Sequence, residues 1–350
     1  MYAVPIYEPW DAPPPSDEEV RALYEAWIQV REAHIDLAQQ KPLTFGMVNP
    51  ETGEFNLFSY MANYDNGLPA VFILRGLDAI EHVARRGLSE DVARHVAETA
   101  VFNLVWVKPN GVSDEDRKRL EARGFTFGEG EKWPYIVSSR PGFVVRFPTA
   151  QEVRFITLAL QKFIEFFPDL ERFREEWRED HAWPILIPED RENDTWNIVD
   201  DIKFTPSPPL KYALPKKLLR RAKALPRTPE SFTVYLEWVP DVVVEREDGS
   251  EAYAYVLVTM ESLFMNAVQF TTMYVEKSLD DIYQRVPQTV LEHLIAIGKC
   301  PSVLHTAQEE ISYALQKLEK PLDLQVTQGD LPPLMERVLE EIRLQLKQLE

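Results

Sequence analysis

The sequence predicts an α/β protein, with a mixed α+β N-terminal domain and a C-terminal mixed sheet flanked by helices. Three observations favour this fold class. In the last third of the chain, several strand-length runs rich in Val, Tyr, Phe, Met and Thr are followed by alternating helical and strand patterns. In the first half, two runs of strand length are almost wholly apolar, and apolar residues at helical spacing flank both regions. Strands that pair and then alternate with helices typically form one sheet covered by helices.

The first half is predicted to begin with a helix and to continue into a sheet. Ser16 and Glu19 have the spacing of a capping box, which starts a helix with an apolar stripe. Strands are predicted over Thr44–Val48 and Glu54–Met61, around a turn containing Asn, Pro and Gly. Two nearly all-apolar strands, of the kind buried on both faces, are predicted over Pro69–Leu74 and Val101–Val107. Helices are predicted over Leu77–Arg86, Glu90–Ala100 and Ser113–Arg123.

The length of 350 residues favours two domains or one large one. A second capping box, from Thr149 to Glu152, starts a long helix that runs into an acidic segment near Asp180. We place the domain boundary there, with an N-terminal α+β domain over residues 1–180 and a C-terminal α/β domain over residues 181–350. The second domain is then expected to open with two strands and a basic helix, over Ala182–Ile187, Thr195–Phe204 and Ala213–Ala224.

From about Phe232, four strands are expected before the next helix, with a hairpin turn at Glu247–Ser250. The strands Pro301–Leu304 and Leu322–Val326 are expected to be parallel neighbours or near-neighbours in one sheet, joined by the helix Gln308–Leu318. The other elements predicted in this region are the strands Tyr253–Met260 and Ala267–Val275 and the helices Leu279–Ile297 and Leu331–Leu346.

The composition predicts a cytoplasmic protein. Hydrophobic residues make up 45% and charged residues 27%, as in an ordinary soluble globular protein. The single cysteine, Cys300, permits no internal disulfide, fits a reducing compartment and is expected to be a small buried residue. The N-terminus lacks the basic start and apolar core of a signal peptide. No apolar run approaches the roughly 18 residues that a membrane helix requires.

The net charge of −19 disfavours nucleic-acid binding, which usually depends on Lys and Arg. The charge is uneven, however: Asp169–Asp201 holds 12 acids against 4 arginines, and Lys203–Arg227 holds 8 bases and no acid. Three interpretations of the basic block stay open: pairing with the acidic block, binding of an anionic ligand or nucleic acid, and binding of a protein partner. The candidate binding residues are Lys216, Lys217, Arg220 and Arg221.

No motif of an enzyme class is visible: phosphate-binding loop, nucleophile elbow and zinc motifs are all missing, and no cofactor or metal is predicted. Trp133 and Arg140, with Tyr135 and Phe143, form either a binding pocket of aromatic and arginine side chains or a hairpin with an inward aromatic face. His305 follows a predicted strand at the sheet edge where α/β proteins tend to place ligands. It is interpreted as a half-buried histidine at a strand end, with a ligand or base as the alternative.

Several segments resemble a bacterial family of uncharacterised two-domain proteins. The segments that resemble the N-terminal domain of this family are Pro42–Phe58, Ala70–Leu77 and Trp133–Gly142. The segments that resemble its C-terminal domain are Phe232–Pro240, Ala252–Met260, Gly298–Ser302 and Asp330–Pro333. The resemblance covers most of the chain and implies two domains of unknown function, without an activity or a site.

From Tyr253 onward the chain is also similar to the integrase and transposase branch of the ribonuclease H-like fold. That resemblance implies metal-binding acids on the first core strand, at the end of the fourth strand and on a following helix. Only Glu261 is available for the first place, and Leu304-His305-Thr306 offers no acid for the second, although Glu309 and Glu310 lie one helical turn further on.

The sequence therefore predicts a non-catalytic binding or regulatory module with an unknown partner, for which a protein remains possible. One alternative is a diverged metal-dependent nuclease or phosphodiesterase that uses Glu261, Glu309 and His305. The other is nucleic-acid or anion binding through the basic helix within residues 211–227.

Overall fold

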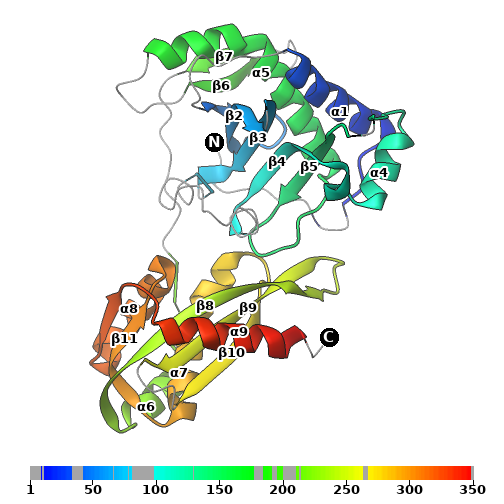
Figure 1. Ribbon diagram of the computed structural model, residues 1–350. Coiled ribbons are helices and arrows are strands. Elements are labelled where there is room, and N and C mark those ends of the chain that lie inside the picture. The colour runs from blue at the N-terminus through cyan, green and yellow to red at the C-terminus, as the bar shows by residue number, and fades with distance from the viewer. Residues whose placement is uncertain are drawn as a thin grey trace. The chain divides into compact units, whose positions relative to one another are not determined.

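The computed structural model describes residues 9, 12–33, 42–65, 67–77, 79–80, 98–128, 130–176, 184–190, 195–199, 210–212, 214–262 and 267–347. The chain divides into two compact units: one comprises Met1–Arg140 and Val145–Ser207, the other Pro141–Val144 and Pro208–Glu350. Each unit holds a mixed sheet flanked by helices (Figure 1), so the predicted fold class is confirmed. No helix among the described residues is long and apolar enough to cross a membrane.

The described part of the first unit contains a seven-stranded sheet with the order β5-β4-β3-β2-β1-β6-β7. β1 and β6 run parallel, and the other neighbouring strands run antiparallel. The strands are β1 (Leu43–Val48), β2 (Phe55–Asp65), β3 (Leu68–Arg75), β4 (Val101–Val107), β5 (Trp133–Ser139), β6 (Ile185–Asp190) and β7 (Thr195–Val199).

The helices α1 (Asp17–Glu32) and α5 (Ala150–Glu176) cover one face of this sheet (Figure 1). The predicted capping box opens α1: the Ser16 N–H donates to Glu19 Oε2 at 2.8 Å, and the Glu19 N–H donates to Ser16 Oγ at 3.2 Å. The apolar stripe of α1, including the fully buried Trp27, faces the core. Two shorter helical segments, η1 (Pro109–Gly111) and α4 (Asp114–Glu121), follow β4.

Stacked aromatic rings fill the layer between the sheet and α5. Phe58 on β2 lies 4.6 Å from Phe45 on β1 and 5.1 Å from Phe163 on α5, measured between ring centroids. All three rings are fully buried, and burial of each such side chain stabilises the fold by about 1.5–3 kcal/mol. This aromatic layer holds the long helix against strands that lie far from it in sequence.

The strands β6 and β7 lie in the first unit, on the other side of the expected domain boundary. A division at Asp180 would place them in the C-terminal domain, but β6 pairs with β1 in the sheet of the first unit. Gly46 on β1 makes room for this pairing, because a Cβ there would lie 2.9 Å from Cγ1 of Ile185. Asp180 lies outside the described residues, as do most of the predicted helices Leu77–Arg86 and Glu90–Ala100.

The described part of the second unit contains a five-stranded sheet with the order β10-β9-β8-β11-β12. β8, β9 and β10 are antiparallel, whereas β11 runs parallel to both β8 and β12. The pairing of Leu304 with Val326 confirms that these two predicted strands are parallel neighbours. The strands are β8 (Arg227–Glu245), β9 (Glu251–Glu261), β10 (Val268–Tyr274), β11 (Cys300–Thr306) and β12 (Gln325–Gln328).

In the described part of the second unit, three strands lie between α6 (Lys216–Lys223) and α7 (Leu279–Ile297), and not the four that were expected. β8 continues as one long strand through Pro240, where its pairing with β9 shifts register between Val239 and Val243. Proline has no N–H to donate and is accommodated at such irregularities. Because β8 belongs to the same sheet and precedes β9, the strand that ends in Glu261 is the second strand of this sheet in chain order, whereas the sequence predicted it to be the first of the ribonuclease H-like core.

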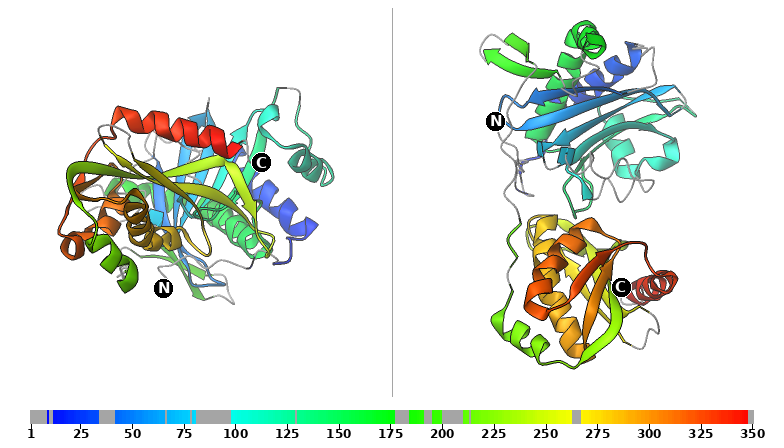
Figure 2. Two further views of the ribbon diagram at one scale, coloured as in Figure 1. Left: turned by 90° about the horizontal axis from the view of Figure 1, so that it is seen from below. Right: turned by 90° about the vertical axis from the view of Figure 1, so that its left-hand side faces the viewer.

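Helices cover both faces of the second sheet (Figure 2). On one face, α7 contacts β9 and β10 and α8 contacts β11, and α6 packs against both of these helices. On the other face, α9 buries Met335, Val338, Leu339 and Ile342 against β8 and β9. The helices are α6 (Lys216–Lys223), α7 (Leu279–Ile297), α8 (Glu309–Leu322) and α9 (Pro333–Lys347).

The segment Pro141–Val144 belongs to the second unit. Phe143 pairs with Ala252 of β9, and the Tyr253 N–H donates to the carbonyl of Gly142 at 3.0 Å. Gly142 has a φ of 85°, and a Cβ there would lie 2.2 Å from Cγ2 of Val275. Glycine is therefore required both by the backbone conformation and by the space available.

Candidate functional site

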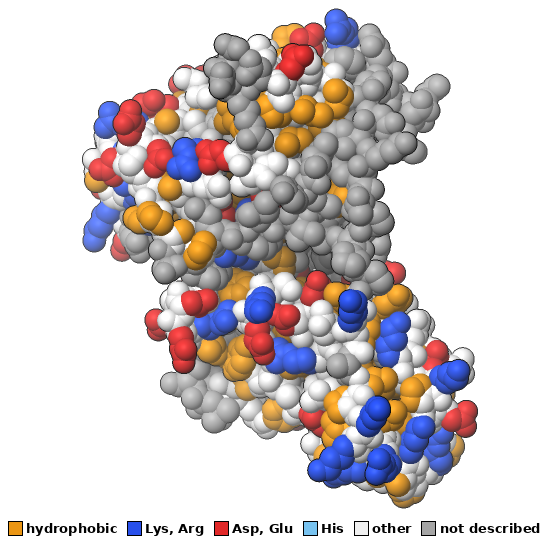
Figure 3. All heavy atoms as spheres, turned by 180° about the vertical axis from the view of Figure 1, so that it is seen from behind, with side chains coloured by type: hydrophobic (Ala, Val, Ile, Leu, Met, Phe, Trp, Pro, Cys, Tyr) orange, Lys and Arg blue, Asp and Glu red, His pale blue; other side chains and the backbone are white. Residues whose placement is uncertain are grey.

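The four predicted binding residues lie together on α6 in the second unit. Lys216, Lys217, Arg220 and Arg221 are all exposed, and we call them the basic surface of α6. The opposite side of the helix carries the buried Ala222 and packs against α7 and α8. The helix is therefore strongly amphipathic: its apolar side anchors it and its charges face solvent. Figure 3 shows Lys and Arg side chains gathered in this part of the molecule, with hydrophobic side chains between them.

No carboxylate in the described part of the second unit forms an ion pair with the basic surface of α6. Arg227, which ends the same basic segment, behaves differently, because it donates to the carbonyl of Asp323 at 2.9 Å. Most of the acidic block lies outside the described residues or in the first unit, so pairing between the two blocks stays a prediction.

Two tyrosines and a lysine contact one another on the segment before α6 and on α8, the helix against which α6 packs. The rings of Tyr212 and Tyr313 are 6.4 Å apart, and Lys317 Nζ lies 4.8 Å from the centroid of the Tyr313 ring. Tyr313 is 48% exposed, which is unusual for so large an aromatic side chain. Burial, followed by the neighbouring Tyr313 and nearby acids, raises the pKa of Tyr212 to about 12. An exposed ring beside lysines provides a flat contact surface next to positive charge.

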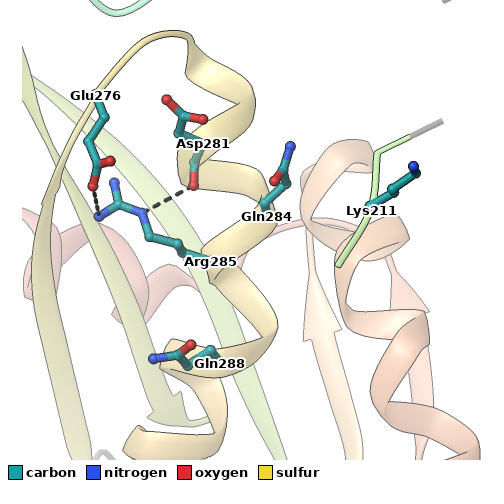
Figure 4. A pocket seen from close by; sticks show the side chains of 6 residues that line it. All are labelled: Lys211, Glu276, Asp281, Gln284, Arg285 and Gln288. Carbon is teal, nitrogen blue, oxygen red and sulfur yellow. Dashed lines mark hydrogen bonds and ion pairs between the residues drawn. The ribbon is translucent and has the colours of Figure 1, made fainter. Parts of the chain in front are cut away.

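A shallow groove of about 230 Å³ runs between Lys211 and the exposed side of α7 (Figure 4). Arg285 in this groove is held by the Tyr274 carbonyl at 2.6 Å and by Glu276 at 3.6 Å. Gln284 and Gln288 contribute amide groups to the same wall. The groove is mixed in charge and open, and it does not form an enclosed site.

The three residues of the nuclease alternative do not converge. Glu261 pairs with Phe232 of β8, and His305 pairs with Thr233, the next residue along β8. Consecutive strand residues point to opposite faces, so Glu261 and His305 lie on opposite faces of the sheet. Glu309 is exposed at the start of α8. Among the described residues, no group of three or more His, Cys, Asp or Glu side chains has the geometry to hold a metal ion.

The contacts of His305 are those of a structural histidine. Its Nε2 lies 2.9 Å from the carbonyl oxygen of Asp330, and its Nδ1 lies 3.1 Å from the Thr327 hydroxyl. Because a carbonyl oxygen only accepts, Nε2 carries a proton in this arrangement. Both ring nitrogens are thus engaged in joining β11 to β12 and to the segment that precedes α9.

Sequence reasoning missed the role of Gln308, which follows the fourth strand of this sheet. Its Oε1 accepts from the Leu236 N–H at 2.8 Å, and its Nε2 donates to the Leu236 carbonyl at 2.9 Å. The pairing of β8 with β11 has ended by this point, so the amide of Gln308 takes the place of a neighbouring strand. An acid at this position would accept but could not donate.

The predicted pair Trp133 and Arg140 does not form one pocket. Trp133 begins β5 and Arg140 follows its end, so the length of that strand separates them. Trp133 packs against Phe127 at 4.9 Å between ring centroids, and the guanidinium of Arg117 lies over its ring. Arg140 is buried near Glu152 and contributes to the electrostatics of that carboxylate.

A buried charge network in the first unit was also missed. Arg75, at the end of β3, contacts Glu54 at 3.2 Å and Glu152 at 2.7 Å, and the three side chains are 2–4% exposed. Burial alone would raise the pKa of Glu152, but Arg75, Arg146, the Thr149 N–H and Arg140 together lower it. The capping box that marks Glu152 in the sequence gives no sign of its long-range partner.

Residues 20–186 match the model of a family described as a domain of unknown function, DUF7309. No curated protein and no solved structure matches the chain. The matched range contains the three residues of the buried charge network, whereas α6 and the five-stranded sheet lie beyond it.

Proposed function

We propose that this protein is a non-catalytic binding module that holds an anionic partner on the basic surface of α6. The observation that carries the proposal is the exposure of four bases on one short helix whose apolar side is anchored by α7 and α8. The overall charge of −19 repels polyanions at long range, so a local cluster of bases is needed to bind one.

The order of the five-stranded sheet supports a ribonuclease H-like core. If its strands are numbered one to five along the chain from β8 to β12, their order across the sheet is 3-2-1-4-5. The second strand runs antiparallel to the first, and the fourth and fifth run parallel to it. In this reading, β8 is the first core strand and β11 the fourth. Glu237 on β8 is engaged by Arg343 of α9, and Gln308 occupies the position after β11. These departures support a scaffold that binds without metal-dependent cleavage.

The first experiment measures binding of heparin and of a fluorescently labelled oligonucleotide. The test variant replaces Lys216 and Arg220 by Gln, and the matched control replaces Lys277 and Arg337, which are exposed on other parts of the second unit. Both variants change the net charge by the same amount, so a difference between them reports position. We expect the test variant to lose at least tenfold in affinity and the control to change little, with binding that weakens as salt rises.

Two results would contradict the proposal. The wild-type protein could fail to bind either polyanion at low salt, or the two variants could lose affinity equally. Pairing of α6 with the acidic block is tested by the joint replacement of all four bases by Gln. If that pairing is their main role, the four-base variant should lose stability by an amount that shrinks as salt rises.

A further inference from the structure

The proposed binding of a polyanion to α6 leaves the pair of Tyr212 and Tyr313 without a role. Their ring centroids are 6.4 Å apart, and the rings are tilted by 53°. Tyr212 is partly buried, whereas Tyr313 is 48% exposed. A lone exposed ring is common on protein surfaces, so the surroundings of this one decide its meaning. We call these two residues the tyrosine pair.

The tyrosine pair lies next to positive charge on α8. Tyr313, Lys317 and Lys320 are exposed and are spaced by three or four residues, which places them on one side of the helix. Lys317 Nζ lies 4.8 Å from the centroid of the Tyr313 ring and 5.6 Å from that of the Tyr212 ring. A ligand that carries a negative charge beside a flat ring could therefore contact both kinds of group at once.

The basic surface of α6 lies within a short distance of the tyrosine pair. Tyr212 precedes Lys216 by four residues, and four residues of chain span at most about 14 Å. α6 also packs against α8, the helix that carries Tyr313. A bound single strand covers about 4–16 nucleotides on the domains that bind such strands, which is long enough to contact both places.

Two acids limit where the negative charges of a ligand can lie. Asp280, at the start of α7, and Glu310, at the start of α8, both act electrostatically on Tyr212. They would repel a phosphate group, whereas Lys317 and the basic surface of α6 would attract one. Phosphates are therefore expected next to Lys317 and α6, and away from the starts of α7 and α8.

We propose that the anionic partner of α6 is a single-stranded nucleic acid, with its phosphates on α6 and Lys317 and a nucleobase stacked on Tyr313. This inference rests on the proposed function and names the class of its ligand. Surfaces that bind single strands combine positive charge with aromatic rings, because a single strand exposes both phosphates and flat nucleobases. A duplex keeps its nucleobases stacked inside, and heparin has none, so neither could use the tyrosine pair.

The test measures fluorescence anisotropy of labelled probes with the full chain at low salt. The probes are oligothymidylate DNA, oligouridylate RNA, an abasic DNA and a DNA duplex, all of one length. Wild type should bind oligothymidylate or oligouridylate about tenfold more tightly than the abasic DNA, which has the same charge but no nucleobase to stack. The duplex should bind more weakly than the better single strand. Whichever of the two single strands binds better shows whether DNA or RNA is preferred.

Variants of Tyr313 locate the stacking contact. Tyr313→Leu should lower the affinity for the better single strand about tenfold and leave the affinity for heparin unchanged. Tyr313→Phe should bind both like wild type, because its ring can still stack. Tyr64→Leu is the matched control, since Tyr64 is a 42% exposed tyrosine on β2 in the first unit. Thermal unfolding shows whether each variant is folded.

The failure of this proposal differs from the failure of the proposed function. Replacement of Lys216 and Arg220 by Gln should weaken both heparin and single-strand binding. If it does so while Tyr313→Leu binds every probe like wild type, the stacking proposal is overturned and the function of α6 stands. If wild type binds no polyanion, both are overturned. If Tyr313→Leu does not fold, equal affinity of wild type for the single strands and the abasic DNA would overturn the stacking proposal.

Discussion

The Nδ1 atom of His293 on α7 lies 2.8 Å from the hydroxyl oxygen of Thr259 on β9. Its Nε2 lies equally close, at 2.8 Å, to the hydroxyl of Thr271 on β10. The imidazole is 4% exposed, and this burial lowers its pKa from 6.5 to about 4. A neutral imidazole donates through one nitrogen and accepts through the other, and hydroxyl groups can serve both roles. His293 thus ties a helix to two strands in its uncharged form.

The stability of the second unit should fall as the pH decreases from about 6.5 to about 4. In this range the unfolded chain takes up a proton on His293 while the folded protein does not, so the folded state loses relative stability. Over this whole pH range, the free energy of unfolding should fall by about 3 kcal/mol. Urea unfolding at several pH values should show this slope in wild type and a shallower one in His293→Gln. Equal slopes would contradict the assignment.

Replacing Glu261 by Gln should raise the stability at pH 7 by about 1 kcal/mol. Glu261 is 2% exposed, and its Oε2 has no hydrogen-bond partner among the described residues. The exposed Glu309→Gln is the control and should change stability by less than about 0.5 kcal/mol. Mg²⁺ or Mn²⁺ should leave the melting temperatures of the wild type and of Glu261→Gln unchanged. Neither ion should support cleavage of DNA or RNA by the wild type. A clear stabilisation of wild type by either ion, lost in Glu261→Gln, would instead favour the nuclease alternative.

Replacing Arg75 by Met should destabilise the first unit by about 3–5 kcal/mol, because two buried carboxylates would lose their counter-charge. This loss of stability should be smaller at low pH, where Glu54 and Glu152 become protonated and no longer need a counter-charge. Arg154→Met removes a guanidinium from two acids that are partly exposed to solvent, and it should cost only about 0–1 kcal/mol. Chemical denaturation of both variants at pH 7 and pH 4 provides the measurement. A similar cost for the two variants would argue against the network.

Replacing Gln308 by Ala should cost about 1–3 kcal/mol, because the backbone N–H and carbonyl of Leu236 lose their partners. Gln308→Glu should cost more than Ala does, since a carboxylate cannot donate to the carbonyl and is repelled by it. Gln316→Ala, at an exposed position of the same helix, serves as the control. Hydrogen exchange at Leu236 should accelerate in the Gln308 variants and not in the control.

Elements encoded by short-range patterns were predictable. The capping box at Ser16, the helix α7 and the apolar stripe of α9 depend on residues within a few turns of one another. The parallel pairing of β11 with β12 was also predicted, since one helix joins the two strands. The exposure of the basic surface of α6 follows from its spacing around the apolar Leu218, Leu219 and Ala222. In each case the information lies within a single element or between adjacent elements.

The remaining features depend on contacts between distant segments. By itself the sequence determined the fold class, most elements of the second unit and the basic character of α6. Only the tertiary structure decided that β6 joins the first sheet, that Glu261 and His305 face opposite sides, and that Arg75 meets Glu152. The physical reason is that strand register and long-range ion pairs are set by packing across the whole unit, where a shift of one residue reverses the face of every side chain.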